Sequence, residues 1–397
     1  MKSILFLSNG HGEDIIASTI VKETMNFLPN YNILAAPLVG LGQPYRSLGV
    51  QMAIPCATMP SGGFVKRNLK AFLRDFRAGL LGLVMRQAMA LKKAKKDIDI
   101  VVAVGDVYPL LMARLFVRKP IIFLPTAKSD YIAPHLPIEV NFMRRWARIV
   151  LPRDEKTAQA LRENGVKAKY VGNAMMDALD ITGEDFGVEQ GRRVITLLPG
   201  SRGEAYNNMN YLLEVVEFLD KLAPNDLEFL VALAPSLDLK LLSQEIEGSQ
   251  WRIDMYNERP LTASITSQSS EVKIIQGMFG DCINVADIVI GMAGTGNEQA
   301  VGIGKPVVTF PGGGPQFTEA FAAVQKRLLG DAVSALPRDP KRIAYEVLSI
   351  LEDKERYSHM QRVGRERMGQ PGAAKRMAQV IAEELERLQN HQKGEWV

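Results

Sequence analysis

The stretch Ser3-Ile-Leu-Phe-Leu-Ser-Asn-Gly-His-Gly-Glu-Asp14 places a short apolar run directly before a glycine-rich turn. A fully apolar run of this length is typical of a strand that is buried on both faces of a parallel sheet. The residues that follow carry apolar side chains at helical spacing, at Ile16, Ile20 and Val21. They predict a helix from about Ile15 to Phe27, so the chain opens on a strand–turn–helix unit of an α/β domain.

Similar runs rich in Val, Ile and Leu recur along the chain, with helical stretches between them. The predicted strands cover residues 98–104, 121–124, 149–151, 194–198, 228–233, 272–275, 288–290 and 307–310. This alternation predicts an α/β protein with two doubly wound parallel sheets. We expect an N-terminal domain over residues 1–175, a C-terminal domain over 176–368 and a final segment, 369–397. The final segment should hold a helix from Gln370 to Asn390, with Pro371 in its first turn.

Composition excludes several classes of protein. The chain has 397 residues, of which 47% are hydrophobic and 23% charged, so neither a disordered chain nor a fibre is expected. Its two cysteines, Cys56 and Cys282, form no disulfide framework and fit a reducing cytoplasm. The first residues lack the apolar core of a signal peptide, and no apolar stretch approaches the roughly 18 residues of a membrane span. We therefore expect a soluble or peripheral protein.

Positive charge is concentrated in one window of the chain. Between Lys66 and Lys96 ten Lys and Arg stand against one acid, Asp75, although the whole chain has a net charge of only +4. Apolar residues from Leu69 onward trace one helical face among these cations. The pattern predicts that residues 64–96 bind an anionic membrane surface. The alternative is a core helix with a solvated basic face, and nucleic-acid binding is disfavoured because no RNA- or DNA-binding motif accompanies the charge.

The turn after residues 194–198 contains Gly200, Ser201 and Arg202. A Gly-Ser turn at a helix N-terminus offers free backbone N–H groups to an anion. Arg202 adds a planar, bidentate donor suited to phosphate. This pattern predicts a phosphate site, and its alternative is an ordinary turn with a surface arginine.

A second glycine-rich turn follows residues 288–290. It contains Gly294, Thr295, Gly296, Asn297 and Glu298. Glycines permit a ligand to approach the backbone closely, and an acid just inside the next helix can accept both hydroxyls of a ribose. The spacing is not that of a nicotinamide-binding fingerprint. The alternative role of Glu298 is a first-turn acid that favours the helix dipole.

The third strand-end turn is Pro311-Gly-Gly-Gly-Pro-Gln316. Three consecutive glycines are costly in chain entropy, so some close approach to this backbone is expected. Gln316 and Glu319 are polar groups near a helix start and could contact sugar hydroxyls. Their alternative role is helix capping.

Two residues are candidate general bases. His11 lies between glycines after the first strand, and Asp106 follows Gly105 after residues 98–104. Imidazole is well matched to proton removal near neutral pH. The alternatives are that His11 hydrogen-bonds a loop, that Asp14 caps the first helix and that Asp106 caps the next one. No cluster has convincing metal-ligand spacing, so we expect no metal.

Together these features resemble the GT-B glycosyltransferases, and among them the lipid-A-disaccharide synthases and proteins related to them. The resemblance spans roughly residues 3–385. It is strongest in Leu197-Leu-Pro-Gly-Ser-Arg202, in Tyr170-Val-Gly-Asn-Ala-Met-Met-Asp177 and in Gly369-Gln-Pro-Gly-Ala-Ala374. It implies two Rossmann-like domains that face a cleft, an acceptor site in the first, a UDP-sugar site in the second and a C-terminal helix that packs back toward the first.

The resemblance also implies residue roles. Phe279 falls where the backbone of the superfamily holds uracil, and Glu298 falls in the UDP-sugar site. In the related lipid II synthase a Gln and an Asn contact the sugar at the positions of Gln316 and Glu319, so the Glu leaves the sugar open. The first loop departs from the Gly-Glu-x-Ser-Gly-Asp pattern of the synthases, and Glu204 lies one residue earlier than their acid.

The expected activity is that of an inverting glycosyltransferase. It would move a hexose or N-acetylhexosamine from a UDP-sugar to a lipid-linked hydroxyl at the inner face of the membrane, with no cofactor besides the donor. The alternatives are a nucleotide-sugar epimerase of the UDP-GlcNAc type and a non-catalytic relative that binds carbohydrate or lipid. The acceptor, the sugar and the oligomeric state stay open.

Overall fold

The computed structural model describes residues 2–57, 80–256 and 260–393. The chain folds into two compact units: unit 1 comprises Met1–Ala178 and Pro371–Val397, and unit 2 comprises Leu179–Gln370. The first division therefore falls after Ala178 rather than after residue 175, and the second after Gln370 rather than after residue 368. The predicted amphipathic helix from Leu69 lies outside the described residues over 58–79.

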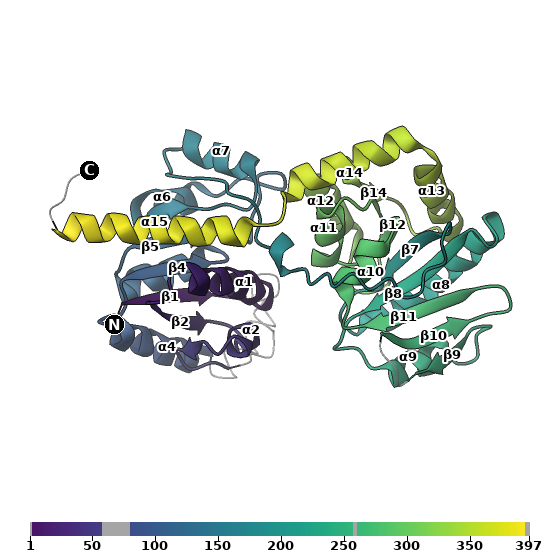
Figure 1. The fold of residues 1–397 in the computed structure, drawn as a ribbon, viewed down its shortest axis with the longest axis horizontal. Helices are drawn as coiled ribbons and strands as arrows, with labels where there is room; N and C mark the ends of the chain where they lie inside the picture. Colours follow the sequence, from purple (N-terminus) through teal and green to yellow (C-terminus); the bar gives the residue numbers. More distant parts are fainter. Residues whose placement is uncertain (1, 58–79, 257–259, 394–397) are drawn as a thin grey trace. The chain divides into compact units, whose positions relative to one another are not determined.

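Unit 1 is built on a parallel sheet in its described part (Figure 1). Its strands are β1 (Ser3–Ser8), β2 (Asn32–Pro37), β3 (Gln51–Met52), β4 (Ile100–Val104), β5 (Ile121–Leu124) and β6 (Ala147–Val150). Their spatial order is β3-β2-β1-β4-β5-β6, and all the pairings are parallel. The chain builds outward from β1 to β3, returns, and builds the other way from β4 to β6. The strand order therefore reverses between β1 and β4.

Helices cover both faces of this sheet. They are α1 (His11–Phe27), α2 (Gln43–Ser47), α4 (Leu80–Ala94), α5 (Val107–Met112) with a π-helical turn (Ala113–Val117), α6 (Pro137–Trp146), α7 (Glu155–Glu163) and α15 (Ala373–Lys393). The apolar side chains of α1 and α15 share one buried cluster with Ile4 and Phe6. Side chains of α4 to α7 share another with Leu5 and Leu7. The alternate residues of β1 therefore enter opposite cores, which explains why its sequence is apolar throughout.

Unit 2 contains a mixed sheet (Figure 1). Its strands are β7 (Arg193–Leu198), β8 (Leu227–Leu233), β9 (Arg252–Met255), β10 (Leu261–Thr266), β11 (Glu271–Gln276), β12 (Ile288–Gly291), β13 (Val307–Thr309) and β14 (Val333–Ala335). Their order is β14-β13-β12-β7-β8-β11-β10-β9. The expectation of a wholly parallel sheet is wrong at one edge, where β9 and β10 run antiparallel. The remaining pairings are parallel, and the order reverses between β7 and β12.

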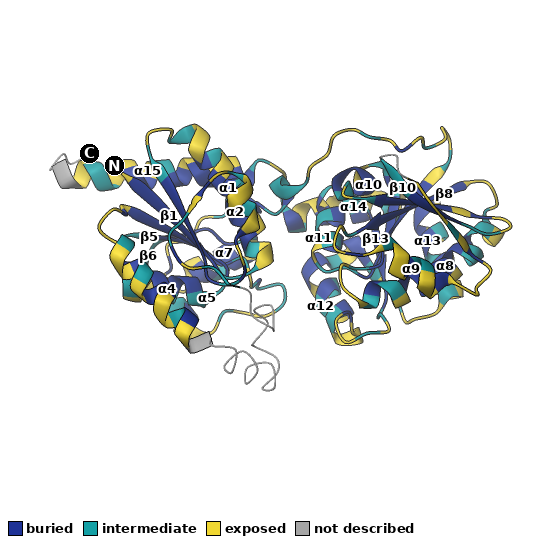
Figure 2. Cartoon of the chain, turned by 90° about the horizontal axis from the view of Figure 1, so that it is seen from below, coloured by how far each residue is buried: buried dark blue, intermediate teal, exposed yellow. Residues whose placement is uncertain are grey.

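The helices of unit 2 also lie on both faces of the sheet (Figure 2). They are α8 (Glu204–Leu222), α9 (Leu239–Ile246), α10 (Phe279–Val285), α11 (Thr295–Gly302), α12 (Glu319–Leu329), α13 (Pro340–Glu352) and α14 (Lys354–Met368). Side chains of α8 and α13 pack with Ile195 and Leu197 in one large cluster. On the other face the Thr196 hydroxyl donates to the carbonyl of Cys282 in α10, at 2.7 Å.

Two predicted helix starts are wrong. Helix α1 begins at His11 rather than Ile15, because Gly10 takes an extended N-cap conformation and Glu13 and Asp14 suit a first turn. Helix α15 begins at Ala373, so Pro371 lies before it and not in its first turn. Asp177 fixes this start by accepting from the backbone N–H groups of Gly372 and Ala374.

Candidate functional site

Each sheet has one crevice at which the strand order reverses, and ligands of open α/β sheets bind outside the carboxyl ends of the strands at such a switch point. In unit 1 the β1 and β4 ends meet there, with Ser8 paired to Val104. In unit 2 the β7 and β12 ends meet, with Leu198 paired to Gly291. The sequence-predicted residues fall at these two crevices and at the neighbouring strand ends.

The turn after β7 is bent through a glycine. Gly200 has a φ of +106°, and a Cβ there would lie 3.4 Å from the carbonyl oxygen of Met292, in the turn after β12. Ser201 and Arg202 follow on the surface, and Gly203 is the N-cap of α8. The structure thus brings the predicted phosphate turn against the second glycine-rich turn.

The turn after β12 is tied together by Asn297. This residue is fully buried, and its Nδ2 donates to the carbonyl of Gly291 at 3.1 Å. A Cβ on Gly291 would lie 1.9 Å from Asn297 Oδ1, so only glycine fits. The side chain of Asn297 therefore holds the turn that carries Gly294 and Thr295.

Phe279 lies beside the same turn. A Cβ on Gly296 would lie 3.5 Å from the Phe279 ring and 3.3 Å from Leu198. Phe279 is the first residue of α10 and is half-buried. The residues predicted to bind the uracil and the phosphates are thus neighbours at the carboxyl edge of the sheet.

Glu298 lies in the first turn of α11 and is only 9% exposed. Gln325 of α12 donates from Nε2 to Glu298 Oε1 at 3.4 Å, and Gln325 is 2% exposed. Gln325 was not predicted from the sequence, because it lies far along α12. A buried polar residue on the apolar face of that helix is the signal that could have found it.

The helices of unit 2 differ in how they begin. Side chains cap α9, α12, α13 and α14, and the caps are Asp238, Thr318, Asp339 and Asp353. Helices α8 and α11 start after Gly203 and Gly294 and have no side-chain cap. No side-chain cap therefore occupies the first-turn N–H groups of these two helices, although each helix has an acid in its first turn, Glu204 or Glu298.

The three consecutive glycines after β13 pack against helix α8. Gly312, Gly313 and Gly314 lie against Asn208, Asn207 and Glu204 of α8. The expected close approach is therefore an approach to a helix. Gln316 and Glu319 are both exposed, and Thr318 caps the helix that Glu319 begins.

At the switch point of unit 1 a side-chain bond joins the two strand ends. Asn9 Nδ2 donates to Asp106 Oδ1 at 2.7 Å, and the same oxygen accepts from the Tyr108 backbone N–H at 2.8 Å. The capping role of Asp106 is confirmed. Gly105 has a φ of +128°, and a Cβ there would lie 2.0 Å from Asn9 Oδ1.

A buried polar chain lies behind this bond. Ser8 donates to Asp14 Oδ1 at 2.6 Å, and the Tyr45 hydroxyl is 2.7 Å from the Ser8 oxygen. Burial raises the pKa of Asp14 to about 7, and the Ser8 bond only partly offsets it. Asp14 is therefore an interior group rather than the expected helix cap, and Gly10 is the N-cap.

His11 is exposed at the first position of α1. Its ring lies against the loop after β2, since a Cβ on Gly40 would be 2.9 Å from His11 Cε1. Glu13 lies beside the same strand ends, because a Cβ on Gly105 would be 3.3 Å from its Cγ. Neither Glu13 nor Asn9 was predicted from the sequence as a site residue.

Buried polar atoms without a hydrogen-bond partner concentrate at both crevices. In the described part of the chain they include Asn9 Oδ1, Asp14 Oδ2, Asn297 Oδ1 and Gln325 Oε1. Such atoms are rare in folded proteins and mark strained or functional positions. Four of the eight belong to residues at or behind the two switch points.

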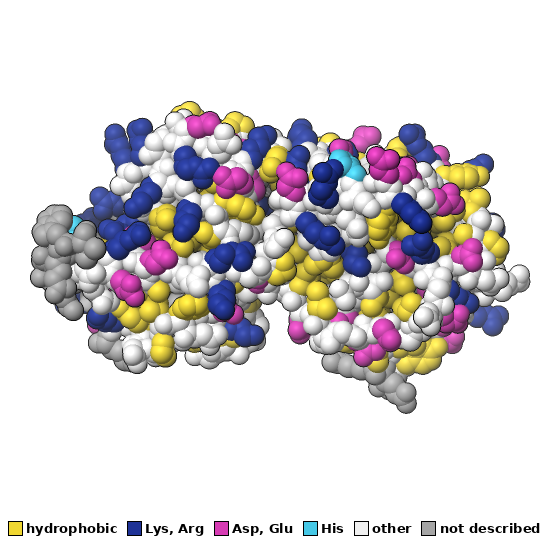
Figure 3. All heavy atoms as spheres, turned by 45° about the horizontal axis from the view of Figure 1, so that its top comes forward, with side chains coloured by type: hydrophobic (Ala, Val, Ile, Leu, Met, Phe, Trp, Pro, Cys, Tyr) yellow, Lys and Arg dark blue, Asp and Glu magenta, His cyan; other side chains and the backbone are white. Residues whose placement is uncertain are grey.

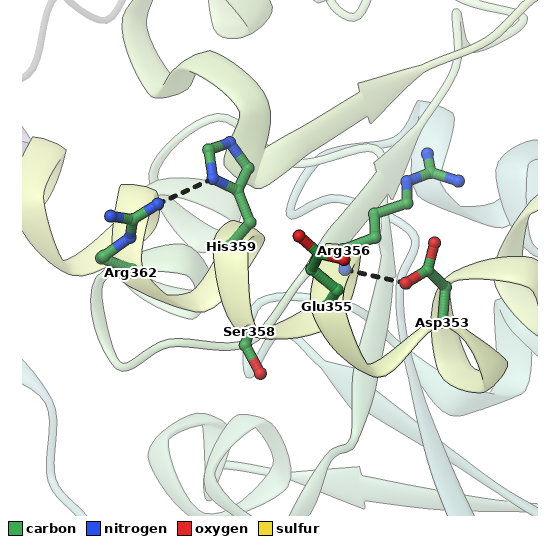
Figure 4. Close-up of a pocket in the computed structure, with 6 residues that line it drawn as sticks. All are labelled: Asp353, Glu355, Arg356, Ser358, His359 and Arg362. Carbon is green, nitrogen blue, oxygen red and sulfur yellow. Dashed lines mark hydrogen bonds between the residues drawn. The ribbon is translucent and has the colours of Figure 1, made fainter.

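One hollow of unit 2 lies away from the switch point. It has a volume of about 690 Å³ and is lined by Asp353, Glu355, Arg356, Ser358, His359 and Arg362 at the start of α14 (Figure 4). Arg362 donates to His359 Nδ1 at 3.0 Å, and Arg356 pairs with Glu346. Because its cations are held by neighbours on the surface, this hollow is not a candidate active site. Over the described residues no group of three His, Cys, Asp or Glu is placed to hold a metal ion.

Comparison with known proteins gives relatives at low identity. No family model matches the chain. The lipid-A-disaccharide synthase of Trichlorobacter lovleyi is 25% identical over 283 residues, which cover 65% of this chain and 63% of that protein. The synthase of Geobacter sulfurreducens is 23% identical over 413 residues, which cover 96% of this chain and 97% of that protein.

Solved structures share the fold at lower identity. The calicheamicin glycosyltransferase CalG4 has a TM-score of 0.63 at 16% identity, and the match covers 97% of this chain and 98% of that one. The UDP-GlcNAc 2-epimerase of Neisseria meningitidis, bound to UDP-GlcNAc, has a TM-score of 0.60 at 15% identity and covers 96% and 100%. The chain therefore has the GT-B fold and is related to the lipid-A-disaccharide synthases.

Proposed function

We propose that the protein is a glycosyltransferase that uses a UDP-sugar as donor and a lipid-linked hydroxyl as acceptor. The observation that carries the proposal is the switch point of unit 2. There the uncapped N-termini of α8 and α11 meet Arg202, Phe279 and Glu298 at one strand edge. Backbone N–H groups and a guanidinium suit a diphosphate, and a carboxylate suits ribose hydroxyls.

Each part of the donor then has a residue. The turn from Gly200 to Arg202 and the start of α11 at Thr295 hold the diphosphate. Glu298 accepts from the ribose, and the backbone at Phe279 holds the uracil. Gln316 and Glu319 contact the sugar. As the bond to the sugar breaks, Arg202 and the two helix N-termini stabilise the negative charge that develops on the departing diphosphate.

Unit 1 would bind the acceptor and supply the general base. His11 or Asp106 removes the proton of the attacking hydroxyl as the new bond to the sugar forms. Asn9 Nδ2 and the Tyr108 backbone N–H both donate to Oδ1 of Asp106, which orients this carboxylate. An attack on the face opposite the departing diphosphate inverts the anomeric centre.

Helix α4 supports membrane binding by unit 1. Its buried face packs Leu83 and Leu91 into the core, whereas Met85 and Met89 are 65% and 57% exposed. Arg86, Lys92 and Lys93 are exposed on the same helix. None of the described helices has the length and apolar character needed to cross a bilayer. Cations worth about 1 kcal/mol each near anionic lipid would hold the protein peripherally, at the inner face of the membrane.

The donor site is tested by binding of UDP. Isothermal titration calorimetry should show that UDP binds the wild type and that Arg202→Ala and Glu298→Ala each weaken binding at least tenfold. Arg252→Ala is the matched control, because Arg252 is exposed on β9 at the far edge of the same sheet. A wild type that binds no UDP would refute the proposal.

The reaction class is tested by turnover. UDP release from a panel of UDP-sugars should require added lipid acceptor. An epimerase, the second candidate, would instead convert the UDP-sugar alone, and the epimerase likeness of the fold favours including that assay. Binding without turnover under either condition would identify a non-catalytic relative.

Membrane binding is tested by flotation with liposomes. The wild type should float with anionic and not with neutral vesicles, and Met85→Ser with Met89→Ser should reduce flotation several-fold. Met25→Ser, on α1 of the same unit and 36% exposed, is the control. Flotation that depends on neither the lipid charge nor the salt concentration would contradict this proposal. It would favour the alternative that α4 is a core helix with a solvated basic face.

A further inference from the structure

One face of α8 receives the loop that joins β13 to α12. The residues of this face are Glu204, Asn207, Asn208 and Tyr211, which are spaced as one helical stripe. The loop runs from Phe310, directly after β13, to Phe317, and Gly312 closes it by donating its N–H to the Phe317 carbonyl at 2.8 Å. We call this stripe of α8 and the loop from Phe310 to Phe317 together the glycine seat.

The three glycines permit this contact. A Cβ on Gly312 would lie 3.0 Å from Asn208 Oδ1, and one on Gly313 would lie 2.7 Å from Asn207 Nδ2. A Cβ on Gly314 would lie only 1.8 Å from Glu204 Oε2 and 2.8 Å from Glu204 Cβ. Since real Cβ atoms do not approach so closely, any side chain at Gly314 would push the loop off the helix.

Hydrogen bonds fix the far end of the loop to the same helix. The backbone N–H of Gln316 donates to Glu204 Oε2 at 3.2 Å, and the N–H of Gly313 faces Asn208 Oδ1 at 3.4 Å. Asn208 is 1% exposed, and its Nδ2 donates to the Pro199 carbonyl at 3.0 Å. Asn208 therefore joins the glycine loop to the turn that precedes Gly200.

Aromatic contacts anchor the near end. The rings of Tyr211 and Phe310 are 5.2 Å apart, and the guanidinium of Arg338 lies 4.3 Å from the centre of the Tyr211 ring. The loop is thus held at both ends by α8, and Gln316 is the first exposed polar side chain beyond the contact with Glu204.

We propose that Glu204 and Asn208 are positioning residues that set the selectivity for the sugar of a nucleotide-sugar donor. They act through the glycine seat, which fixes the backbone of Gln316 against the start of α8. The inference rests on the proposed function. It adds that sugar selectivity depends on residues of α8 that touch neither sugar nor nucleotide, and that it is separable from affinity for the nucleotide.

The test compares UDP, UDP-glucose and UDP-N-acetylglucosamine as probes by titration calorimetry. In Glu204→Ala the dissociation constant of the preferred UDP-sugar should rise at least fivefold relative to that of UDP. Glu204→Gln keeps an acceptor for the Gln316 N–H and should stay within twofold of the wild type in this ratio. Because both variants remove the same charge, their difference measures what the side-chain acceptor and its contacts with the loop contribute.

A second variant changes the loop itself rather than helix α8. Gly314→Ala should reproduce the relative loss of Glu204→Ala. Gly82→Ala, at an exposed helical glycine of unit 1 where a Cβ would lie 3.6 Å from the Arg86 side chain, an ordinary van der Waals contact, and Glu214→Ala, exposed on α8, should change nothing. Thermal unfolding followed by circular dichroism checks that each variant folds.

The outcomes separate the two proposals. A wild type that binds no UDP overturns the proposed function together with this inference. A wild type that binds UDP but does not discriminate between the sugars overturns this inference alone. So does an equal rise in the dissociation constants of UDP and UDP-sugar in Glu204→Ala, since that is the mark of a merely structural role.

Discussion

The two switch points have the same topology and opposite chemistry. In unit 1 side chains bridge the crevice, with Asn9 bonded to Asp106 and acids at Glu13 and Asp14. In unit 2 glycine turns leave the backbone open, and two helices start there without side-chain caps. One crevice therefore offers groups that can exchange protons, and the other offers fixed dipoles for an anion.

The charge of the units does not follow this division. Unit 1 carries 29 Lys and Arg against 17 Asp and Glu, whereas unit 2 carries 19 against 27. On the face drawn in Figure 3, basic side chains predominate over unit 1, and the two signs are mixed over unit 2. The unit proposed to bind a diphosphate is thus the acidic one. Its affinity has to come from local groups, namely Arg202 and helix N-termini.

The sharpest way to test the comparison is to remove the candidate bases. His11→Ala or Asp106→Asn should lower kcat by about 10²–10⁴-fold, the usual effect of losing general base catalysis, with the dissociation constant of UDP unchanged. Stopped assays of UDP release and titration calorimetry measure the two quantities. If both variants keep full turnover, unit 1 contains no base and the contrast between the crevices is lost.

Replacing Arg202 should give the converse pattern. Arg202→Ala should lower kcat/KM by about 10²–10³-fold, because charge on the departing diphosphate loses its bidentate donor. Arg202→Lys should recover only part of the lost kcat/KM, since an ammonium group cannot make two parallel hydrogen bonds to the diphosphate. Steady-state kinetics decide the point, and Arg252→Ala should behave as the wild type. A full recovery with lysine would show that only the net charge matters.

The buried acid of unit 1 predicts a pH dependence of stability. With the pKa of Asp14 raised from 3.8 to about 7, the folded state keeps a proton that the unfolded state releases. The stabilisation is complete below pH 3.8 and is lost as the pH rises to about 7, by at most about 1.4 kcal/mol per pH unit.

Asp14→Asn should remove this slope. Urea denaturation between pH 4.5 and 8 measures the free energy of unfolding, and Asp97→Asn, at an exposed position of the same unit, is the control. Identical slopes in wild type and Asp14→Asn would mean that Asp14 is ionised in the fold and that the unit 1 crevice is less apolar than its burial indicates.

The smallest expected effect concerns Gln325, which orients Glu298 in unit 2. Gln325→Leu should weaken UDP about tenfold, since a carboxylate that loses its donor no longer faces the ribose in one orientation. The same substitution should leave the affinity for 2′,3′-dideoxyuridine diphosphate unchanged, because that ligand has no hydroxyls for Glu298. Equal losses with both ligands would assign Gln325 to packing alone.

Much of this architecture could be predicted from the sequence, because parallel strands buried on both faces are continuous apolar runs. Residues 288–290 and 307–310 are examples, and glycines at their ends mark the turns. The antiparallel pair of β9 and β10 was missed, because its exposed edge mixes polar and apolar residues. The pattern also could not show which residues meet across the fold, such as Asn9 with Asp106.

The glycine seat shows the same limit. The cost of three adjacent glycines was readable from the sequence, and it correctly predicted a close approach. The partner was not readable, because Glu204 and Gly314 are brought together only when β7 and β13 enter one sheet. Local patterns predict elements, and tertiary contacts decide what each glycine or polar side chain is for.

The placement of α15 has a consequence for synthesis of the chain. Residues 2–178 leave the ribosome before unit 2, yet Ile16 and Ile20 of α1 share one buried cluster with Met377 and Ile381, which are translated after unit 2. At about 5–20 residues per second, unit 1 waits roughly 10–40 s for its final helix while all of unit 2 is made. Unit 1 is therefore completed only after unit 2 has been translated, and a nascent chain stopped before residue 373 leaves an apolar face of α1 for chaperones to bind.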